Sequence, residues 1–449
     1  MLRGKDRALP VSETLAGLKC GEISALDAAR EALTRAKRCR IDINAFSVLD
    51  KKGALAAAAE SERRYKDGTP RPLEGVPVAV KDMIDTAGCE TRYGSQAFVG
   101  NVPIRDSAIV RSLREAGAVI TGKTTTHEFA WGVTTASEAF GDTLNPHDKS
   151  RIPGGSSGGM AAAIAYGAVS AGLGTDTGGS VRIPAALCGT VGFKPTYNRL
   201  PSQGIFPLAK SLDHPGILGA AMEDVIALSA VFGLEAQRPP EKLRIAALPH
   251  LPPVPADTAT AAAFKAFCQQ LEPLARITPL QDTEMFEGLF DAFADTVLVE
   301  AGTEHSALHD PEFIRETYQP ETASRIELAQ AKSVSDLTSA RKRTWQFQSD
   351  LARLFEEFDF LILPTCPCTA PLRGQAELTI GGWSGSERQV LMAYTAPFNL
   401  AGTPALSLPV QHLTGSELPV GVQLVAASGN DEMLLGLARR LEGILQPAA

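Results

Sequence analysis

The sequence predicts a single large α/β domain in which helices cover both faces of a β-sheet. Segments with the periodicity of amphipathic helices alternate with short apolar segments bounded by turn residues, which is the pattern expected of such a fold. Apolar segments close to the end of the chain resemble those near its beginning, and no repeat or low-complexity linker separates them. The 449 residues, 44% of them hydrophobic, are enough for one extensive core.

The first half of the chain is expected to alternate helices with strands. Four segments have helical periodicity: Val11–Arg38, Gly53–Lys66, Ser107–Glu115 and Gly159–Tyr166. Three apolar segments are expected to be strands: GVPVAVKDMID from Gly75, Ala118–Thr121 and Ala168–Leu173. Lys81 is anomalous, because it places a charged residue near the end of the first of these otherwise apolar segments.

The second half is expected to be helical at first and then to return to the sheet. A middle region of about 236–334 is interrupted by prolines and mostly helical, with one strand in LRIAALP and no functional motif. A charged amphipathic helix at Thr338–Phe358 leads into the strand DFLILP. Two more apolar strands, PALSLPV and PVGVQLVAA, precede a closing helix at Asp431–Leu445. We therefore expect the segment of about 338–445 to complete the same sheet.

The charge balance and the absence of long apolar runs argue against two classes of partner. A formal net charge of −8 and a pI of about 5.5, with no long basic run, disfavour a nucleic-acid surface. No apolar run reaches the roughly 18 residues that a membrane span needs. The first residues, MLRGKDRALPVSE, lack the apolar stretch of a secretory signal. A cytoplasmic protein is expected.

The cysteines and histidines do not predict a metal site. The seven cysteines are scattered and the closest pair is C-P-C, so neither a disulfide framework nor a zinc site is indicated. The histidines do not cluster, and the dipeptide His127-Glu128 lacks the second histidine of HExxH. We expect the protein to use neither a metal nor another cofactor.

Residues 154–159, GGSSGG, directly precede an expected helix. A flexible linker fits poorly, since the segment runs straight into a helix in the middle of the domain. A phosphate-binding loop has this shape, but the GK[ST] and GxGxxG patterns are missing. The GxSxG pattern of a nucleophile elbow fits around both Ser156 and Ser157, yet the preceding NPHDKSRIP resembles a turn rather than the strand that an elbow requires.

A fourth interpretation combines Ser156 with Lys81 upstream and with Ser180 in GTDTGGSVRIPAALCG downstream. A serine hydroxyl needs a base to become a nucleophile. No histidine is well placed for this in the sequence, whereas a lysine kept neutral by burial can serve. One serine can then relay a proton between Lys81 and the attacking serine. The backbone amides of residues 177–180, two of them glycines, can converge as an oxyanion hole.

These segments together resemble the amidase signature family of serine hydrolases. The resemblance rests on GGSSGG, TDTGGSVRIPAALCG and the lysine of VPVAVKD, and on the flanking HEFAWG, FGDTLNP, GFKPTYNRLP, SLDHPG and LPVGVQLVAA. It is dense over about 73–216, patchy over the next hundred or so residues, and returns over about 360–445. The resemblance implies one α/β/α domain spanning residues 1–449, with a large, mixed and twisted central sheet.

The resemblance also implies a role for each residue of the catalytic group. Ser180 is the nucleophile, Lys81 is the terminal base, and Ser156 is the bridging serine, which follows Gly155 through a non-proline cis peptide bond. The oxyanion hole is formed by the backbone amides of four successive residues: Thr177, Gly178, Gly179 and Ser180. No metal or cofactor is implied.

Other residues are expected to support this group. Asp176 and Arg182 flank the nucleophile, and an ion pair between them is expected to brace the loop. Ser157 is expected to support the catalytic serines through hydrogen bonds. The segment HEFAWGVTT aligns with the family's substrate-facing loop, although a tryptophan is also common in a protein core. Two sets of substrate contacts are therefore expected: Trp131, Gly132 and Val133, and from the tail Asn399, Gly402 and Thr403.

The implied function is hydrolysis of a C–N bond, other than a peptide bond, in a small amide, aryl amide or carbamate (urethane). The protein is expected to act through an acyl-enzyme, as a monomer or homodimer, without nucleic acid or membrane. The catalytic group cannot separate an amide from a carbamate or a urea, because the attacked carbonyl is of the same kind. Two alternatives remain: the glutaminase subunit of a tRNA-dependent amidotransferase, for which no tRNA-directed feature is visible, and a non-catalytic scaffold, which the intact Lys81, Ser156 and Ser180 disfavour.

Overall fold

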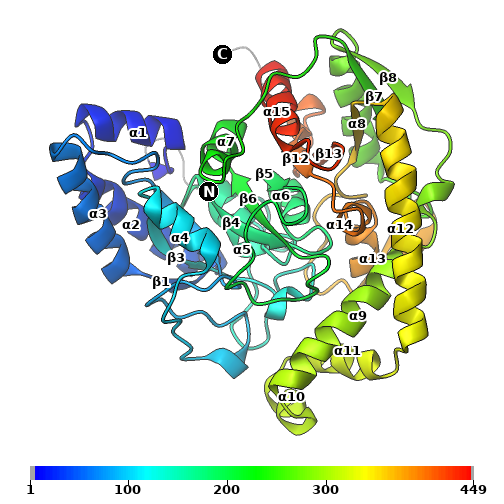
Figure 1. Cartoon of the computed structure of the whole chain (residues 1–449), viewed down its shortest axis with the longest axis horizontal. Helices are drawn as coiled ribbons and strands as arrows, with labels where there is room; N and C mark the ends of the chain where they lie inside the picture. The colour runs from blue at the N-terminus through cyan, green and yellow to red at the C-terminus, as the bar shows by residue number, and fades with distance from the viewer. Residues whose placement is uncertain (1–5, 446–449) are drawn as a thin grey trace.

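The computed structural model describes residues 6–445 and has an 11-stranded sheet with helices on both of its faces (Figure 1). The sheet has the strand order β1-β3-β2-β4-β6-β5-β12-β13-β9-β7-β8. Its strands are β1 (Phe46–Leu49), β2 (Pro77–Lys81), β3 (Val119–Thr124), β4 (Ala171–Asp176), β5 (Val191–Lys194), β6 (His214–Gly219), β7 (Leu243–Ala247), β8 (Ala275–Pro279), β9 (Phe360–Pro364), β12 (Ala405–Pro409) and β13 (Gly421–Val425). A separate hairpin joins β10 (Glu377–Ile380) to β11 (Trp383–Ser386).

The helices surround this sheet. In chain order they are α1 (Val11–Cys20), α2 (Ala25–Ile43), α3 (Lys51–Lys66), α4 (Ala108–Glu115), α5 (Gly158–Tyr166), α6 (Arg182–Cys188), α7 (Met222–Ala230), α8 (Thr258–Leu271), α9 (Leu289–Leu308), α10 (Pro311–Thr317), α11 (Pro320–Gln330), α12 (Val334–Glu357), α13 (Glu387–Met392), α14 (Pro397–Leu400) and α15 (Asp431–Leu445). Figure 1 shows α1, α2 and α3 gathered at one end of the molecule (blue), while α9, α10 and α11 project together with one end of α12 on the other side.

The sheet is mixed. The group β3-β2-β4 and the group β9-β7-β8 are each parallel, and the pairs that connect them through β6, β5, β12 and β13 are antiparallel. The C-terminal strands β12 and β13 lie inside the sheet, between β5 and β9. The predicted α/β fold with a mixed sheet is confirmed, and the tail does complete the same sheet as the N-terminal half.

Strand β2 illustrates how the sheet packs on both faces. Val78 and Val80 contribute to the larger hydrophobic core, whereas the intervening Ala79 belongs to a second core that contains α5. Successive side chains of a strand point to opposite faces, so both faces of β2 are covered. This is why the strand appears in the sequence as a continuous apolar run that ends in Lys81.

Two expectations about the first half need correction. The segment Val11–Arg38 is two helices, because Gly21 ends α1 in the left-handed conformation at φ 78° and Ser24 caps α2 by accepting a hydrogen bond from the amide of Asp27. The strand expected at Ala168–Leu173 runs instead over Ala171–Asp176. Helix α5 ends at a left-handed Gly167, and the chain needs residues 168–170 to turn back into the sheet.

The sequence analysis also missed several strands. Strand β6, HPGILG, contains a proline and two glycines, and β5, VGFK, has only four residues. Such residues normally indicate turns, but here both strands are buried between neighbours that satisfy their backbone groups. Strand β8 lies at the sheet edge and is only partly buried, so its sequence has no continuous apolar run.

Within residues 6–445, no helix is both long and apolar enough to cross a membrane. The same described residues hold no group of three or more His, Cys, Asp or Glu side chains arranged to bind a metal ion.

Candidate active site

Lys81 lies at the end of β2, completely buried. Its Nζ donates hydrogen bonds to Ser156 Oγ at 2.7 Å and to Thr175 Oγ1 at 2.7 Å. Burial lowers the pKa of Lys81 to about 7, against the smaller opposing effect of the Asp176 and Asp213 carboxylates. A substantial fraction of Lys81 is therefore neutral near neutral pH, which is the state that a general base requires.

Ser156 follows Gly155 through a cis peptide bond and is completely buried. Gly155 packs directly against the loop at Val133 and Thr134, and a β-carbon at this position would lie 2.8 Å from the Thr134 amide nitrogen. No side chain larger than hydrogen fits there without moving the loop. The glycine-serine cluster is therefore wedged into the core of the site, which excludes the flexible-linker interpretation.

Ser157 connects the glycine-serine cluster to the segment that contains Ser180. Its hydroxyl donates to the Thr175 carbonyl at 3.1 Å, and its amide donates to the Ser180 carbonyl at 3.1 Å. The backbones of residues 156–157 and 175–180 thus lie side by side, although Ser156 and Ser180 are 24 residues apart in the sequence. The expected supporting role of Ser157 has a direct structural basis in these two bonds.

Ser180 lies in the turn between β4 and α6 and is 7% exposed. Its hydroxyl has no hydrogen-bond partner among residues 6–445, and none joins it to the Ser156 hydroxyl. The structure thus joins Lys81 to Ser156 and brings the Ser180 backbone against Ser157. The relay contact between Ser156 and Ser180 stays a prediction.

The peptide between Gly178 and Gly179 is fixed at both ends. The Gly178 carbonyl accepts a hydrogen bond from Thr395 Oγ1 at 2.7 Å, and the Gly179 amide donates to Asp176 Oδ1 at 2.8 Å. The carbonyl and the N–H of one trans peptide point in opposite directions, so the two contacts fix one plane. The Gly179 amide is therefore already engaged, and the expectation of four oxyanion donors is reduced to three.

The remaining amides, those of Thr177, Gly178 and Ser180, have no partner within the described part of the chain. They are available to an oxyanion. A β-carbon at Gly178 would collide with Met392 Cε and would lie 2.5 Å from Phe293 Cζ, so these two side chains would have to shift to accept a larger residue. Gly179 has a φ of +129°, which side chains rarely adopt.

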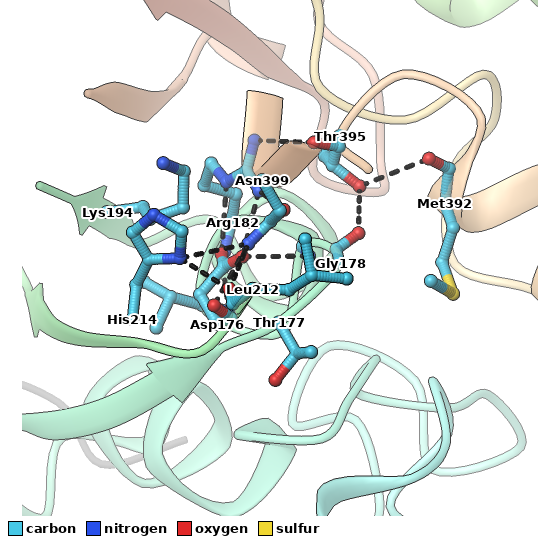
Figure 2. A network of polar contacts seen from close by, with 12 residues as sticks. Asp176, Thr177, Gly178, Arg182, Lys194, Leu212, His214, Met392, Thr395 and Asn399 are labelled. Atoms are coloured by element: carbon cyan, nitrogen blue, oxygen red, sulfur yellow. Dashed lines mark hydrogen bonds and ion pairs between the residues drawn. The ribbon is translucent and has the colours of Figure 1, made fainter. Parts of the chain in front are cut away.

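Asp176 and Arg182 form the expected ion pair, at 2.8 Å and with both side chains completely buried. Figure 2 shows Asn399 from α14 meeting this pair: Arg182 donates to Asn399 Oδ1, and the Asn399 amide donates to the Asp176 carboxylate at 2.8 Å. Burial alone would disfavour the charge of Asp176, but the positive charge and hydrogen bonds of Arg182 outweigh it and lower the pKa of Asp176. Since Asp176 also holds the amides of Gly179 and Val181, this network shapes the turn around Ser180.

Arg182→Leu is expected to lower the free energy of unfolding by about 3–5 kcal/mol, because Asp176 would stay buried without its charge partner. Equilibrium denaturation in urea measures this. The matched control is Arg244→Leu, whose ion pair with Asp359 at 2.7 Å has an Arg244 side chain that is 53% exposed. That variant is expected to lose less than about 1 kcal/mol. Similar losses for the two variants would contradict the bracing role of Arg182.

Thr395→Val is expected to lower kcat about 10- to 100-fold and to leave KM nearly unchanged, because the Gly178–Gly179 peptide loses one of the two bonds that fix it beside the oxyanion donors. Steady-state kinetics on an anilide substrate measure both constants. Thr395→Ser keeps the hydroxyl and is expected to retain most of kcat. A serine variant as slow as the valine variant would show that the methyl group, and not the hydrogen bond to Gly178, matters.

The structure places the three loop residues that were expected to contact substrate in different surroundings. Trp131 is 1% exposed, and its ring stacks on His305 with a centroid distance of 6.2 Å. Gly132 packs against the ring of His127, whereas Val133 lines a cavity of about 510 Å³. Trp131 is thus placed as a core residue, whereas Val133 borders a cavity, and contact of either residue with substrate stays a prediction.

The tail residues are hydrogen-bonded to the nucleophile loop and to the segment that follows α6. Asn399 belongs to the buried ion-pair network. The Thr403 carbonyl accepts from the buried Lys194, and the Gly402 carbonyl accepts from the Tyr197 amide. These contacts hold the tail against the segment that follows α6.

Sequence reasoning missed two residues of this site. Thr175 holds Lys81, and Thr395 holds Gly178. Thr175 lies in the GTDTGGS segment that contains the nucleophile, so its position near the end of β4 was a usable signal. Thr395 precedes α14 in a segment without a motif, and nothing in the sequence places it near Gly178.

Comparison with known proteins identifies the class to which this fold and site belong. A family model described as Amidase matches residues 27–435. The chain therefore belongs to the amidase signature family, and the resemblance of its motifs is confirmed.

Particular relatives cover nearly the whole chain. It is 34% identical over 480 residues to a glutamyl-tRNA(Gln) amidotransferase subunit from Myxococcus xanthus (strain DK1622), with 97% of this chain and 96% of the relative covered. It is 33% identical over 454 residues to AtzE, the 1-carboxybiuret hydrolase subunit from Pseudomonas sp. (strain ADP), with 96% and 97% covered. A solved structure described as an amidase superposes with a TM-score of 0.89 at 32% identity and covers 97% of this chain and 99% of its own.

Proposed function

We propose that this protein hydrolyses the C–N bond of a small amide, with Ser180 as nucleophile, Ser156 as proton relay and Lys81 as base. One observation supports this most strongly. The buried Lys81 Nζ lies 2.7 Å from the hydroxyl of Ser156, whose neighbour Ser157 is hydrogen-bonded to the backbone of Ser180. A lysine of lowered pKa, two serines and free backbone amides together make up an acyl-transfer site.

The first half of the reaction forms the acyl-enzyme. Neutral Lys81 accepts the proton of Ser156, which takes the proton of Ser180 as the Ser180 Oγ–C bond forms. Negative charge on the carbonyl oxygen is stabilised by the free amides of Thr177, Gly178 and Ser180. When the C–N bond breaks, the proton held on Lys81 returns through Ser156 to the leaving nitrogen, so the amine departs neutral.

The second half regenerates the enzyme. Water gives a proton through Ser156 to Lys81 as its oxygen bonds to the acyl carbon, and the Ser180 Oγ–C bond then breaks. The proton returns to Ser180, and a carboxylic acid is released. Every step uses groups of this chain, the substrate and water.

A panel of primary amides, anilides, aryl carbamates and ureas at matched concentrations tests the class of substrate. We expect hydrolysis of at least one amide by the isolated chain and loss of that activity in Ser180→Ala. Carbamates offer the same kind of carbonyl, so urethane hydrolysis belongs to the same proposal. The absence of hydrolysis across the whole panel would contradict it.

The second candidate function is that of a glutaminase within a tRNA-dependent amidotransferase, which is favoured by the 34% identity to the Myxococcus xanthus relative. The same panel separates the two. Glutamine hydrolysis that appears only when the remaining subunits of such an amidotransferase are added would favour the glutaminase. Turnover of amides by the chain alone favours the free-standing hydrolase.

A further inference from the structure

Asp213 lies directly before β6, opposite the turn of residues 177–180 that contains Ser180 (the nucleophile turn). The last pair of the β4–β6 ladder joins Asp176 to His214. Thr177 follows the first of these residues and Asp213 precedes the second, so the two face each other where the antiparallel ladder ends. The Thr177 hydroxyl donates a hydrogen bond to Asp213 Oδ1 at 2.6 Å. A carboxylate therefore holds the residue that supplies the first of the three free amides of this turn.

The carboxylate of Asp213 is itself held in place. Its Oδ2 accepts hydrogen bonds from the backbone amides of Leu208 at 2.9 Å and Ala209 at 3.1 Å. The loop that contains these amides is anchored in turn, because the Phe206 amide donates to the Met83 carbonyl at 2.9 Å, in the segment that follows β2. Asp213 therefore joins the nucleophile turn to a loop that is fixed beside the strand of the expected base.

Asp213 is ionised near neutral pH. Burial raises its pKa to about 6, and the hydrogen bonds from Thr177, Ala209 and Leu208 oppose this rise. The Glu300 carboxylate, from α9, adds a smaller effect in the same direction as burial. A hydrogen bond to an ionised carboxylate is roughly twice as strong as one between neutral groups. The bond from the Thr177 hydroxyl is therefore a strong restraint.

No other hydrogen bond within residues 6–445 restrains Thr177. Neither its amide nor its carbonyl has a partner in that part of the chain, and one side of the residue borders a cavity of about 380 Å³ that Asp213 also lines. Figure 2 shows the Thr177 side chain pointing away from Asp176, which holds the nucleophile turn farther along through the Gly179 amide. The carboxylates of Asp176 and Asp213 therefore fix different parts of the same turn.

We propose that Asp213 is a positioning residue for the reaction, which directs the Thr177 amide towards the oxyanion by holding the Thr177 side chain. This rests on the proposed function, since the direction of the amide matters only if Ser180 attacks a carbonyl. An oxyanion donor is effective when it is aligned before the negative charge develops, because no reorganisation is then needed at the transition state. A hydrogen bond from the side chain fixes its rotamer and the position of Cα, and so limits the rotation of the adjoining amide.

Thr177→Val removes the hydroxyl and keeps the shape of the side chain. It is expected to lower kcat about 10- to 100-fold and to leave KM nearly unchanged, because the oxyanion forms only after the substrate is bound. Thr177→Ser keeps the hydroxyl and is expected to retain most of kcat. The matched control is Thr196→Val, which breaks a bond of the same kind, from Thr196 Oγ1 to Asp431 Oδ2 at 2.5 Å, between the segment after β5 and α15. It is expected to change kcat less than about twofold.

Asp213→Ala tests whether the effect of the Thr177 hydroxyl depends on Asp213. In that background, Thr177→Val is expected to lower kcat less than about threefold further, because the hydroxyl has already lost its acceptor. An undiminished loss there, equal losses in Thr177→Val and Thr177→Ser, or a loss in Thr196→Val as large as in Thr177→Val would each overturn the positioning role. Thermal unfolding checks that each variant is folded, and the two Thr177 variants decide alone if Asp213→Ala is not.

The rate at which a fluorophosphonate labels Ser180 provides a readout that does not depend on amide turnover, since the phosphonyl oxygen uses the same donors as a carbonyl oxygen. Thr177→Val is expected to slow the labelling about 10-fold or more, and Thr196→Val is expected to leave it unchanged. Slower labelling in Thr177→Val, without hydrolysis of any amide by the unmodified protein, would refute the proposed function and leave the positioning role standing. Unchanged labelling and unchanged hydrolysis in Thr177→Val would overturn the positioning role and leave the proposed function standing.

Discussion

Replacing Ser180 by alanine is expected to reduce kcat by at least about 10⁴-fold on any substrate that the protein hydrolyses. No other group described in the site can form the acyl-enzyme in its place, and losing the nucleophile of such a unit removes the function of the whole unit. The side chain is small, 7% exposed and without hydrogen-bond partners in the described chain, so its loss should leave the fold unchanged. Steady-state rates and thermal unfolding of the variant measure the two effects.

Ser156→Ala provides the graded comparison. It interrupts the contact with Lys81 Nζ at 2.7 Å but leaves Ser180 and its neighbouring amides in place. We expect a crippled enzyme that still acylates slowly at Ser180. Full activity in Ser180→Ala, or a complete block of acylation in Ser156→Ala with slow acylation in Ser180→Ala, would exchange the roles of the two serines and contradict the proposed mechanism.

Lys81→Ala is expected to lower kcat/KM about 10²- to 10⁴-fold at pH 7, the usual contribution of a general base. In the unmodified enzyme, kcat/KM should rise with pH through about 7, the pKa of Lys81, and then reach a plateau as the amine becomes neutral. The variant lacks that ionisation, and its rate should continue to rise as hydroxide replaces the base. A pH–rate profile identical to that of the unmodified enzyme would exclude Lys81 as the base.

Lys81 is expected to favour catalysis but to destabilise the folded protein, and the second effect can be measured separately. Its pKa is lowered from 10.5 to about 7 in the folded protein, so the unfolded chain binds more protons between these two pH values. The stability cost of burying the ammonium is fully present below pH 7 and disappears as pH rises towards 10.5. Lys81→Met, which fills the same space without a charge, is therefore expected to unfold at a temperature no lower than that of the unmodified protein at pH 6, although it is inactive.

The sequence predicted the elements whose signals are local. Strand β2 was expected because a continuous apolar run is typical of a buried strand, and helix α5 was expected because an alanine-rich segment is typical of a helix. Strand β6 was missed because its stability comes from neighbours on either side, and its own proline and glycines suggest a turn. The break at Gly21 was missed because a helical pattern continues on both sides of it.

The candidate site likewise contains residues that local sequence signals predict and residues that they do not. Lys81, Ser156 and Ser180 could be proposed because they lie in recognisable motifs, and the pairing of Asp176 with Arg182 follows from opposite charges six residues apart. Thr395 was not found, because its role depends on a contact 217 residues away in sequence.

The position of the covalent bond tests the central claim most directly. The unmodified protein can be treated with a fluorophosphonate probe, digested, and analysed by peptide mass spectrometry. We predict one adduct, on Ser180, present in Ser156→Ala at a lower rate of formation and absent from Ser180→Ala. An adduct on Ser156, or an active enzyme that forms no adduct on Ser180, would contradict the mechanism.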